Sequence, residues 1–186
     1  MLSFLEGHVA WHPVQPPGVT APASLARVAE LVREFHDLTA GTALAAGGEV
    51  VCHNDLSPRN TVYRDAGAGL RPVAFLDWDL AAPGARVHDI AHVCWHYLDL
   101  GPGVADPAGA GRRMRLICDA YGLGARDGLV DAILWWQDRC WRGIVVQAAA
   151  GNLAMIRLRD NGAPGAIRAA SGWVTRHRAE LAAPLS

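Results

Sequence analysis

The segment HNDLSPRN, from His53 to Asn60, places an acid and an amide five residues apart within one loop. The acid is Asp55, and Pro58 restricts the backbone between it and the amide, so both side chains can be directed at one point. A carboxylate in such a loop can accept the proton of a hydroxyl group, and an amide oxygen is a hard ligand for a divalent cation. The loop therefore predicts a base and a metal ligand at one site.

A second carboxylate follows a short apolar segment. Residues 73–76 have the sequence VAFL and continue directly into Asp77, so a carboxylate is expected at the end of a buried strand. Two acids and an amide are the groups that metal-assisted phosphoryl transfer requires. Magnesium suits them because it prefers oxygen ligands, keeps several waters and shares its coordination shell with phosphates. The two segments together predict a magnesium-dependent phosphoryl-transfer site.

Each of these loop residues also has a purely structural interpretation. Asp55, Ser57 and Asn60 are residue types that cap turns with their side chains. Arg59 would either contact a phosphate or be solvated, and the sequence favours neither. The loop alone therefore does not separate a catalytic site from a capped turn.

Other polar and aromatic groups favour a structural role. His88, His92 and His96 are spaced to lie on one face of a predicted helix, where they could bind a metal, but a half-buried histidine stripe is the favoured interpretation. The seven tryptophans are interpreted as core residues rather than as a substrate cage. Three acids are interpreted as a solvated face rather than as a wall for a cationic substrate: Asp99, Asp131 and Asp138.

The composition excludes several classes of protein. A formal net charge of −1 with 19% charged residues argues against a nucleic-acid binder. All seventeen basic residues are arginine, so this chain contains no Walker A motif, no Schiff-base lysine and no lysine phosphate clamp. There is no signal-like segment and no long apolar run, which predicts a cytoplasmic protein that does not enter a membrane, with its four cysteines as reduced core thiols.

The candidate site must be positioned by a mixture of helices and strands. Apolar residues recur at spacings of three and four over residues 23–40, which predicts an amphipathic helix. Segments rich in β-branched or aromatic residues predict three strands, at 50–52, 61–63 and 73–76. Helical patterns follow at 88–100, 108–121, 127–150 and 165–182. The expected fold class is α+β and mostly helical, with one domain and a proline-rich extended segment over residues 1–22.

The ordered set of motifs resembles the aminoglycoside phosphotransferase and choline kinase family, whose members are relatives of the protein kinases. The motifs are His-x-Asp-x4-Asn at 53–60, Leu-Asp-Trp at 76–78, Gly-x4-Asp-Ile-Ala at 84–91 and the helix end Phe-His-Asp at 35–37. The resemblance implies that residues 23–186 form the C-terminal lobe of a protein-kinase-like fold. It also implies that residues 1–22 form a hinge-like segment and that the N-terminal nucleotide lobe is absent from this chain.

The resemblance implies a role for each residue of the loop and the following strand end. Asp55 would be the catalytic base, and Asn60 and Asp77 would be the magnesium ligands. Ser57 and Arg59, together with the two metal ligands, would bind the nucleotide. The implied cofactors are Mg²⁺ and ATP or another nucleoside triphosphate.

Two further residues would support the site by this resemblance. His53 and Asp89 are expected to hold the loop in place. Position 54 is Asn where the family usually has Gly, and Asn tolerates the positive φ that such a loop position requires.

The resemblance implies transfer of a phosphoryl group to a hydroxyl of a small molecule, impaired by loss of the N-terminal lobe. The alternative is a non-catalytic small-molecule or partner-binding protein derived from the same family. The acceptor stays open among aminoglycosides, choline, amino-acid alcohols and sugars. A second copy of the chain or a separate N-terminal lobe is expected to cover an apolar face made of Leu2, Phe4, Leu5 and part of the 25–38 stripe.

Overall fold

The computed structural model describes residues 6–10, 16–67 and 69–186, and it has the predicted mixed α+β architecture in which helices predominate. The strands form two small antiparallel sheets, one with the order β1-β3-β4 and one that pairs β2 with β5. The strands are β1 (His8–Val9), β2 (Val50–Cys52), β3 (Thr61–Asp65), β4 (Leu70–Phe75) and β5 (Ala82–Gly84). The helices are α1 (Pro22–Thr39), α2 (Arg86–Tyr97), α3 (Pro107–Tyr121), α4 (Leu129–Ala149), α5 (Leu153–Asp160), α6 (Ala163–Arg176) and α7 (Arg178–Ala182). Single 3₁₀ turns are η1 (Pro17–Thr20), η2 (Ala43–Ala45), η3 (Pro58–Asn60) and η4 (Ala183–Leu185).

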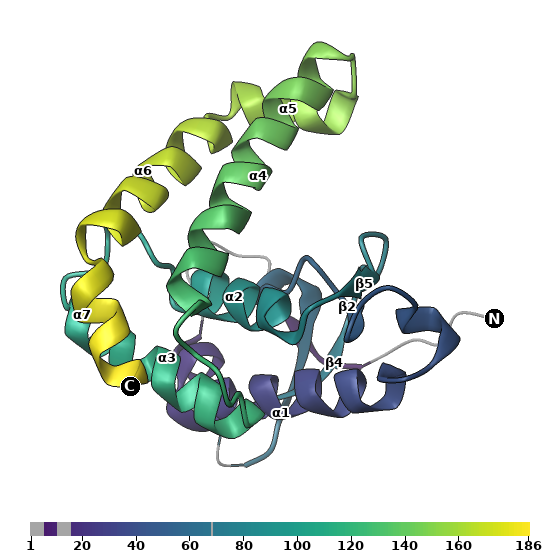
Figure 1. Cartoon of the computed structure of the whole chain (residues 1–186), viewed down its shortest axis with the longest axis vertical. Coiled ribbons are helices and arrows are strands. Elements are labelled where there is room, and N and C mark those ends of the chain that lie inside the picture. Colours follow the sequence, from purple (N-terminus) through teal and green to yellow (C-terminus); the bar gives the residue numbers. More distant parts are fainter. Residues whose placement is uncertain (1–5, 11–15, 68) are drawn as a thin grey trace.

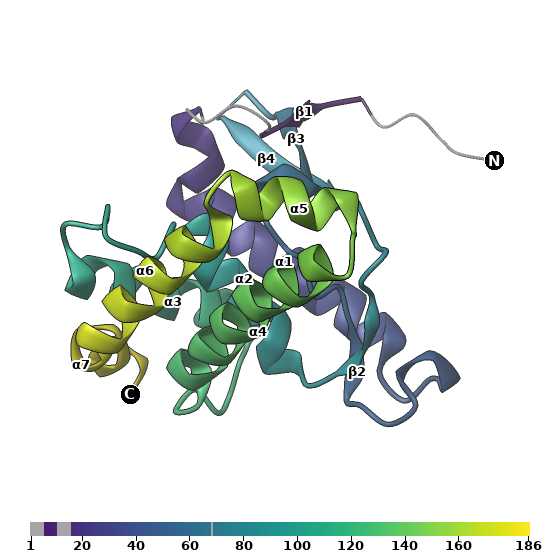
Figure 2. The ribbon, with the colours of Figure 1, turned by 90° about the horizontal axis from the view of Figure 1, so that it is seen from above.

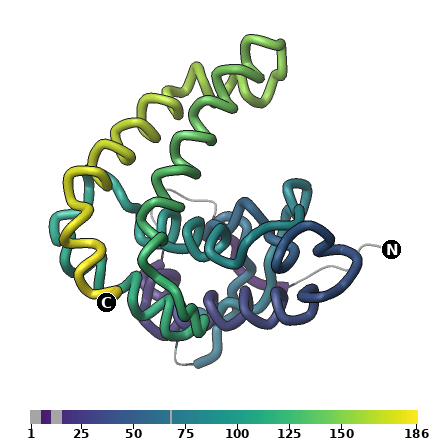
Figure 3. The backbone as a smooth tube through the Cα atoms, in the orientation of Figure 1, coloured from purple at the N-terminus to yellow at the C-terminus, as the bar shows by residue number. Residues whose placement is uncertain are grey.

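Helix α2 lies between the strands and the long C-terminal helices. It packs against α4 on one side and contacts α1 and β2 on the other. Figure 1 shows α4 and α6 side by side, extending away from the rest of the molecule with α5 at their far end. Figure 3 shows that the chain then returns to α3, which α7 and η4 contact. No helix within the described residues is long and apolar enough to cross a membrane.

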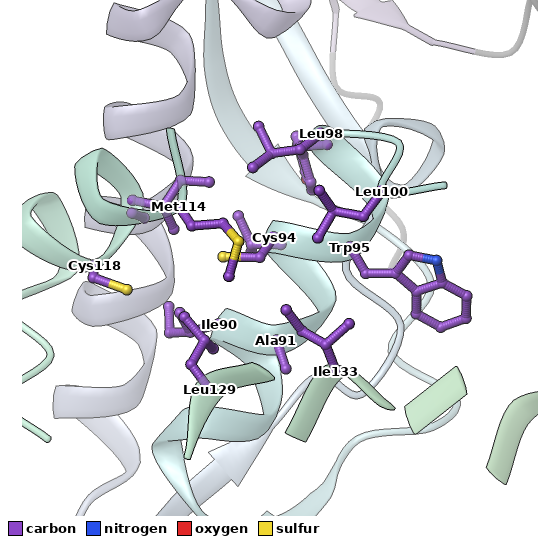
Figure 4. Packing of buried hydrophobic residues seen from close by; sticks show 14 of the residues in the cluster. Ile90, Ala91, Cys94, Trp95, Leu98, Leu100, Met114, Cys118, Leu129 and Ile133 are labelled. Carbon is purple, nitrogen blue, oxygen red and sulfur yellow. The ribbon is translucent and has the colours of Figure 1, made fainter. Parts of the chain in front are cut away.

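The main core surrounds the buried face of α2. Ile90, Ala91 and Cys94 have no solvent exposure, and they pack with Met114 of α3 and Ile133 of α4 (Figure 4). Burying a side chain as large as that of Ile90, Met114 or Ile133 stabilises the fold by about 1.5–3 kcal/mol. The four cysteines are unpaired, as predicted for core thiols. The core therefore fixes α2 relative to α3 and α4.

Helix α1 buries its apolar stripe inside this chain. Leu25, Val28 and Val32 are at most 1% exposed, and α1 packs against α3. The expectation of a bare apolar face along this stripe is therefore wrong for these residues, because α3 already covers them, whereas Leu38 is 79% exposed. The other residues of the expected face lie outside the described residues: Leu2, Phe4 and Leu5.

The predicted helices and strands are present, and three of the differences from the prediction have causes that the structure shows. β5 was not expected because its sequence, Ala-Pro-Gly, has little strand propensity, and it forms through backbone pairing with β2. α5 was also missed, although the Asn152 side chain caps it by accepting from two backbone N–H groups. The helix expected over 165–182 is divided into α6 and α7 at His177.

Candidate active site

A buried carboxylate anchors the start of the candidate loop. Asp89 has no solvent exposure, and its Oδ2 accepts hydrogen bonds from His53 N at 2.7 Å and His36 Nε2 at 3.0 Å. Its Oδ1 accepts from Asn54 N at 2.9 Å. Burial by itself would raise the pKa of Asp89, but the hydrogen bonds from His36, Asn54 and His53 outweigh it and lower that pKa below its ordinary value. Asp89 therefore ties the loop to the first turn of α2.

Two residues of the site adopt left-handed backbone conformations. Asn54 has φ 63° and Asp77 has φ 62°, values that non-glycine residues seldom adopt. The Asn54 side chain donates from Nδ2 to the Leu80 carbonyl at 3.0 Å, which connects the loop to the segment after β4. The expectation that Asn54 accommodates a positive φ is confirmed. Such conformations persist only where the surrounding structure holds them.

The acid and the amide of the loop are in direct contact. Asn60 Nδ2 donates to Asp55 Oδ2 and to the Asp55 backbone oxygen, both at 2.8 Å. Burial raises the pKa of Asp55. The hydrogen bond from Asn60 opposes this rise, and the negative charge of Asp77 adds to it. Within the described residues, no hydrogen bond engages Asn60 Oδ1. The amide thus orients the Asp55 carboxylate with its nitrogen and keeps its oxygen available to a ligand.

The end of β4 brings Asp77 to the same place. β3 and β4 pair with Thr61 opposite Phe75, and Leu76 N donates to the Asn60 carbonyl at 2.9 Å. His53 Nε2 donates to the Leu76 carbonyl at 2.9 Å. Asp77 is the next residue, and its carboxylate is exposed with no hydrogen bond or ion pair to any described residue. Its negative charge adds to the burial that raises the pKa of Asp55.

Tyr97 fixes the middle of the loop from α2. Its hydroxyl donates to the Ser57 carbonyl at 3.0 Å and contacts the Thr61 hydroxyl, which itself donates to the Ser57 carbonyl at 2.9 Å. Ser57 is half-buried, whereas Arg59 is exposed and forms no ion pair with the described residues. The charge of Arg59 lies near His96, since it adds to the effect of burial that lowers the pKa of His96 to about 3. The sequence did not indicate a role for Tyr97, because no local pattern of residues connects it to the loop.

Aromatic rings border the site beside His53. The Trp78 ring lies 4.5 Å from the His53 ring and 4.6 Å from the Phe35 ring, measured between centroids. Trp78 was recognised only as part of a motif, and the structure shows that it covers one side of the His53 imidazole. Together with Phe35, it connects the end of α1 to the segment after β4.

A second group of metal-ligand types lies beneath the loop and is explained by hydrogen bonding. His36, Cys52 and Asp89 have ligand atoms within 4.8 Å of one another, and all three are buried. His36 already bonds Asp89 and, at 2.7 Å, the Tyr121 hydroxyl. Burial raises the pKa of Cys52 to about 12, so the thiolate that a metal requires is disfavoured. These residues therefore act as a structural network.

Helix α4 packs against α2, and its residues Trp136, Gln137 and Cys140 are wholly or partly buried. The charge of Asp55 adds to burial in raising the pKa of Cys140, which places that thiol near the carboxylate. His92 lies 4.4 Å from Trp136 between ring centroids, and burial lowers its pKa to about 4. His92 and Gln137 are buried, and none of their side-chain nitrogen or oxygen atoms has a hydrogen-bond partner within the described structure.

The histidine stripe and the three acids take the structural roles expected of them. His88, His92 and His96 do not form a metal-holding group in the part of the chain that the structure describes. Asp131 pairs with Arg178 at 2.6 Å and Asp138 pairs with Arg142 at 2.8 Å on the surface, while Asp99 is exposed. The carboxylates that line the candidate site are therefore those of the loop and the β4 end.

Comparison with known sequences identifies the class of protein to which this chain belongs. Residues 4–124 match the phosphotransferase enzyme family, a match that spans more than half of the chain and includes the whole candidate site. The chain belongs to this family. Among curated relatives, it is similar to the trifolitoxin immunity protein of Rhizobium leguminosarum bv. trifolii, with 30% identity over 156 residues that cover 72% of this chain and 56% of the relative. The chain thus spans little more than half the length of that relative. No solved structure matches the chain.

Proposed function

We propose that this chain transfers a phosphoryl group from ATP, or from another nucleoside triphosphate, to a hydroxyl of a small molecule. The observation that carries the proposal is the 2.8 Å contact between Asn60 and Asp55, formed beside the exposed carboxylate of Asp77. Membership of the phosphotransferase family supports it. Under the same proposal, residues 23–186 form the C-terminal lobe of a protein-kinase-like fold and residues 1–22 form its hinge-like segment.

Asp55 would be the catalytic base that orients the acceptor hydroxyl and accepts its proton. Its partial burial raises its pKa, which makes the carboxylate a stronger base than one in water. Asn60 holds the carboxylate through Nδ2, so that one rotamer faces the acceptor. Positioning of this kind, with neutralisation of charge, supplies most of the rate in phosphoryl transfer.

The residues present fit a magnesium ion. Asn60 Oδ1 and the Asp77 carboxylate are oxygen ligands without partners among the described residues. Asn60 directly precedes β3 and Asp77 lies two residues after β4, where Thr61 is paired with Phe75. When bound, Mg²⁺ would neutralise the charge on the phosphates. Ser57 and Arg59 would lie on the nucleotide side of the loop. His53 and Asp89 act through the backbone, as positioning residues.

The name of the matched relative and the state of the cysteines bear on the acceptor and on the cellular location. The relative is named for immunity to trifolitoxin, which favours a protective role in which the acceptor is a toxic compound that carries a hydroxyl. A cytoplasmic location is part of this proposal, because the four cysteines are unpaired and the cytosol keeps thiols reduced.

A non-catalytic binding protein is the second candidate. It is favoured by the absence of lysine from the 186 residues, since no lysine of this chain can then pair with the nucleotide phosphates. The acceptor side of the site would be retained, while nucleotide would bind weakly. A measurement of phosphoryl transfer separates the two candidates.

The test uses magnesium, ATP and a panel of hydroxyl compounds, with transfer followed by the appearance of phosphorylated product. Asp55→Asn is expected to lower transfer by about 10²–10⁴-fold, the contribution of a positioned general base. Asp77→Ala is expected to abolish the dependence of nucleotide binding on magnesium. Asp79→Ala is the matched control, because Asp79 is an exposed acid two residues beyond Asp77. Equal magnesium binding by the wild type and Asp77→Ala would refute the assignment of Asp77.

A further inference from the structure

Helices α4 and α6 extend beyond the rest of the molecule, and α5 joins their far ends (Figure 1). Figure 2 shows α5 lying across these ends, and none of its residues is buried. Residues 143–156, which we call the arm tip, comprise the last two turns of α4 and the first half of α5 with the link between them. The arm tip contains no charged residue. The end of this projection is therefore an uncharged surface.

Apolar side chains at the end of the projection face solvent. Val146 is 67% exposed near the end of α4, and Leu153 is 71% exposed at the start of α5. Residues 155–156 are half-buried, so the opposite face of α5 points away from α4 and α6. Helical spacing places Leu153, Arg157 and Leu158 on that outward face, where all three are exposed. Apolar side chains exposed together in this way mark a contact site.

Arginine side chains flank the arm tip on every helix that forms the projection. Arg139 and Arg142 precede it in α4, and Arg157 follows it in α5. Arg168 of α6 lies beside the same part of α4, since its Cζ is 5.4 Å from the centroid of the Trp141 ring, and the Cζ of Arg142 is 4.5 Å from it. We call these four arginines the arm collar. Basic groups thus stand behind an uncharged end.

The projection is positively charged, whereas the rest of the chain is negatively charged. Residues 138–168 contain five arginines and two aspartates, a net charge of +3, while the whole chain has a net charge of −1. The remaining residues therefore carry a net charge of −4. Within the arm collar, only Arg142 forms an ion pair with a described residue, with Asp138 at 2.8 Å. The complement of this surface is a negatively charged partner that also accepts apolar groups.

We propose that the projection docks on an anionic lipid surface, with the arm tip in the interface and the arm collar at the lipid phosphates. Apolar side chains gain by leaving water, and basic side chains behind them gain by attraction to anionic headgroups. At 1.5 Å per residue, Ala149 lies roughly 10 Å further along α4 than Arg142. Interfacial helices bury their apolar faces to a depth of about 5–10 Å, so the separation fits.

The shape of the molecule favours a lipid surface over a protein as the occupant. A flat bilayer reaches the end of a projection without obstruction, whereas an acidic protein would need a matching groove. No helix of the described residues could cross a membrane, so the contact is peripheral. The cytoplasmic leaflet is the anionic one, which agrees with the location proposed above. The docking does not depend on phosphoryl transfer.

The test is flotation of the purified chain with phosphatidylcholine vesicles that either contain or lack phosphatidylglycerol. The chain is expected to float only with the anionic vesicles, and added salt should weaken its binding because salt screens the arginines. Amide hydrogen exchange should slow at residues 143–158 when these vesicles are present, and it should stay unchanged in the strands.

Substitutions in the arm tip and the arm collar should weaken binding to the anionic vesicles. Val146→Glu and Leu153→Glu should each weaken it at least about tenfold, because a charge replaces an apolar group at the interface. Arg157→Gln should weaken it about fivefold, the effect of one basic residue near an anionic surface. Urea unfolding should show each variant to be as stable as the wild type, since all three side chains are exposed.

Two matched controls change similar side chains away from the projection. Leu38→Glu replaces an apolar residue of α1 that is 79% exposed, and Arg71→Gln replaces an exposed arginine of β4. Both should float as the wild type does. Absence of flotation, equal binding to the two kinds of vesicle, or equal losses in the control variants would overturn the proposal. Self-association in light scattering that Leu153→Glu abolishes, without vesicle binding, would also overturn it, because the arm tip would then contact a second copy of the chain.

Discussion

Replacing Asp89 by Asn should strongly destabilise the fold while preserving the size of the side chain. The carboxylate accepts three hydrogen bonds, from His36 Nε2 and from the backbone N–H groups of His53 and Asn54. An amide in its place offers one acceptor oxygen and presents an N–H group to donors. Removing one partner from a buried charged network costs about 3–5 kcal/mol, and we expect a loss of free energy of unfolding of that size.

Urea unfolding at neutral pH measures this loss, with Asp79→Asn as the control for removal of an exposed carboxylate. The exposed substitution is expected to change stability by less than about 0.5 kcal/mol. A loss below about 1 kcal/mol in Asp89→Asn would refute the reasoning, because the three hydrogen bonds would then contribute no more than an ordinary neutral one.

The pH dependence of stability provides a second assay for Asp89. The pKa of Asp89 is lowered in the folded state. The stability that its carboxylate contributes is therefore fully present above the pKa of the unfolded state, near 3.8, and is lost as the pH falls through the pKa of the folded state. The wild type should therefore lose stability below about pH 4 more steeply than Asp89→Asn. Parallel curves for the two proteins would show that the carboxylate is not stabilised by folding.

Three further predictions concern the loop, helix α4 and the nucleotide. Tyr97→Phe should reduce the free energy of unfolding by about 1 kcal/mol, because the Ser57 carbonyl loses one hydrogen bond, and faster amide exchange at residues 57 and 59–61 should accompany it. Gln137→Leu should stabilise the chain by about 1–3 kcal/mol in urea unfolding, since a buried amide without partners is removed; a loss would indicate that ordered water satisfies the amide. The 186-residue chain should bind ATP with a dissociation constant of about 1 mM or weaker in calorimetry, because it contains no lysine to contact the phosphates; micromolar affinity would contradict this.

The sequence by itself determined most of the elements and the local half of the site. Spacings of three and four residues located α1, and short β-branched segments located β2, β3 and β4, because burial on one face leaves a periodic pattern. Asp55 and Asn60 are five residues apart in a proline-containing loop, so their contact is a short-range property. The order and spacing of the motifs also indicated the family.

Only the tertiary structure decided which distant groups meet. Asp77 reaches the loop because β3 pairs with β4 in one register, and Tyr97 reaches it because the core fixes α2. β5 exists only through its pairing with β2. Contacts of this kind join residues far apart in the chain, and they depend on packing and backbone pairing that no local pattern of residue types specifies.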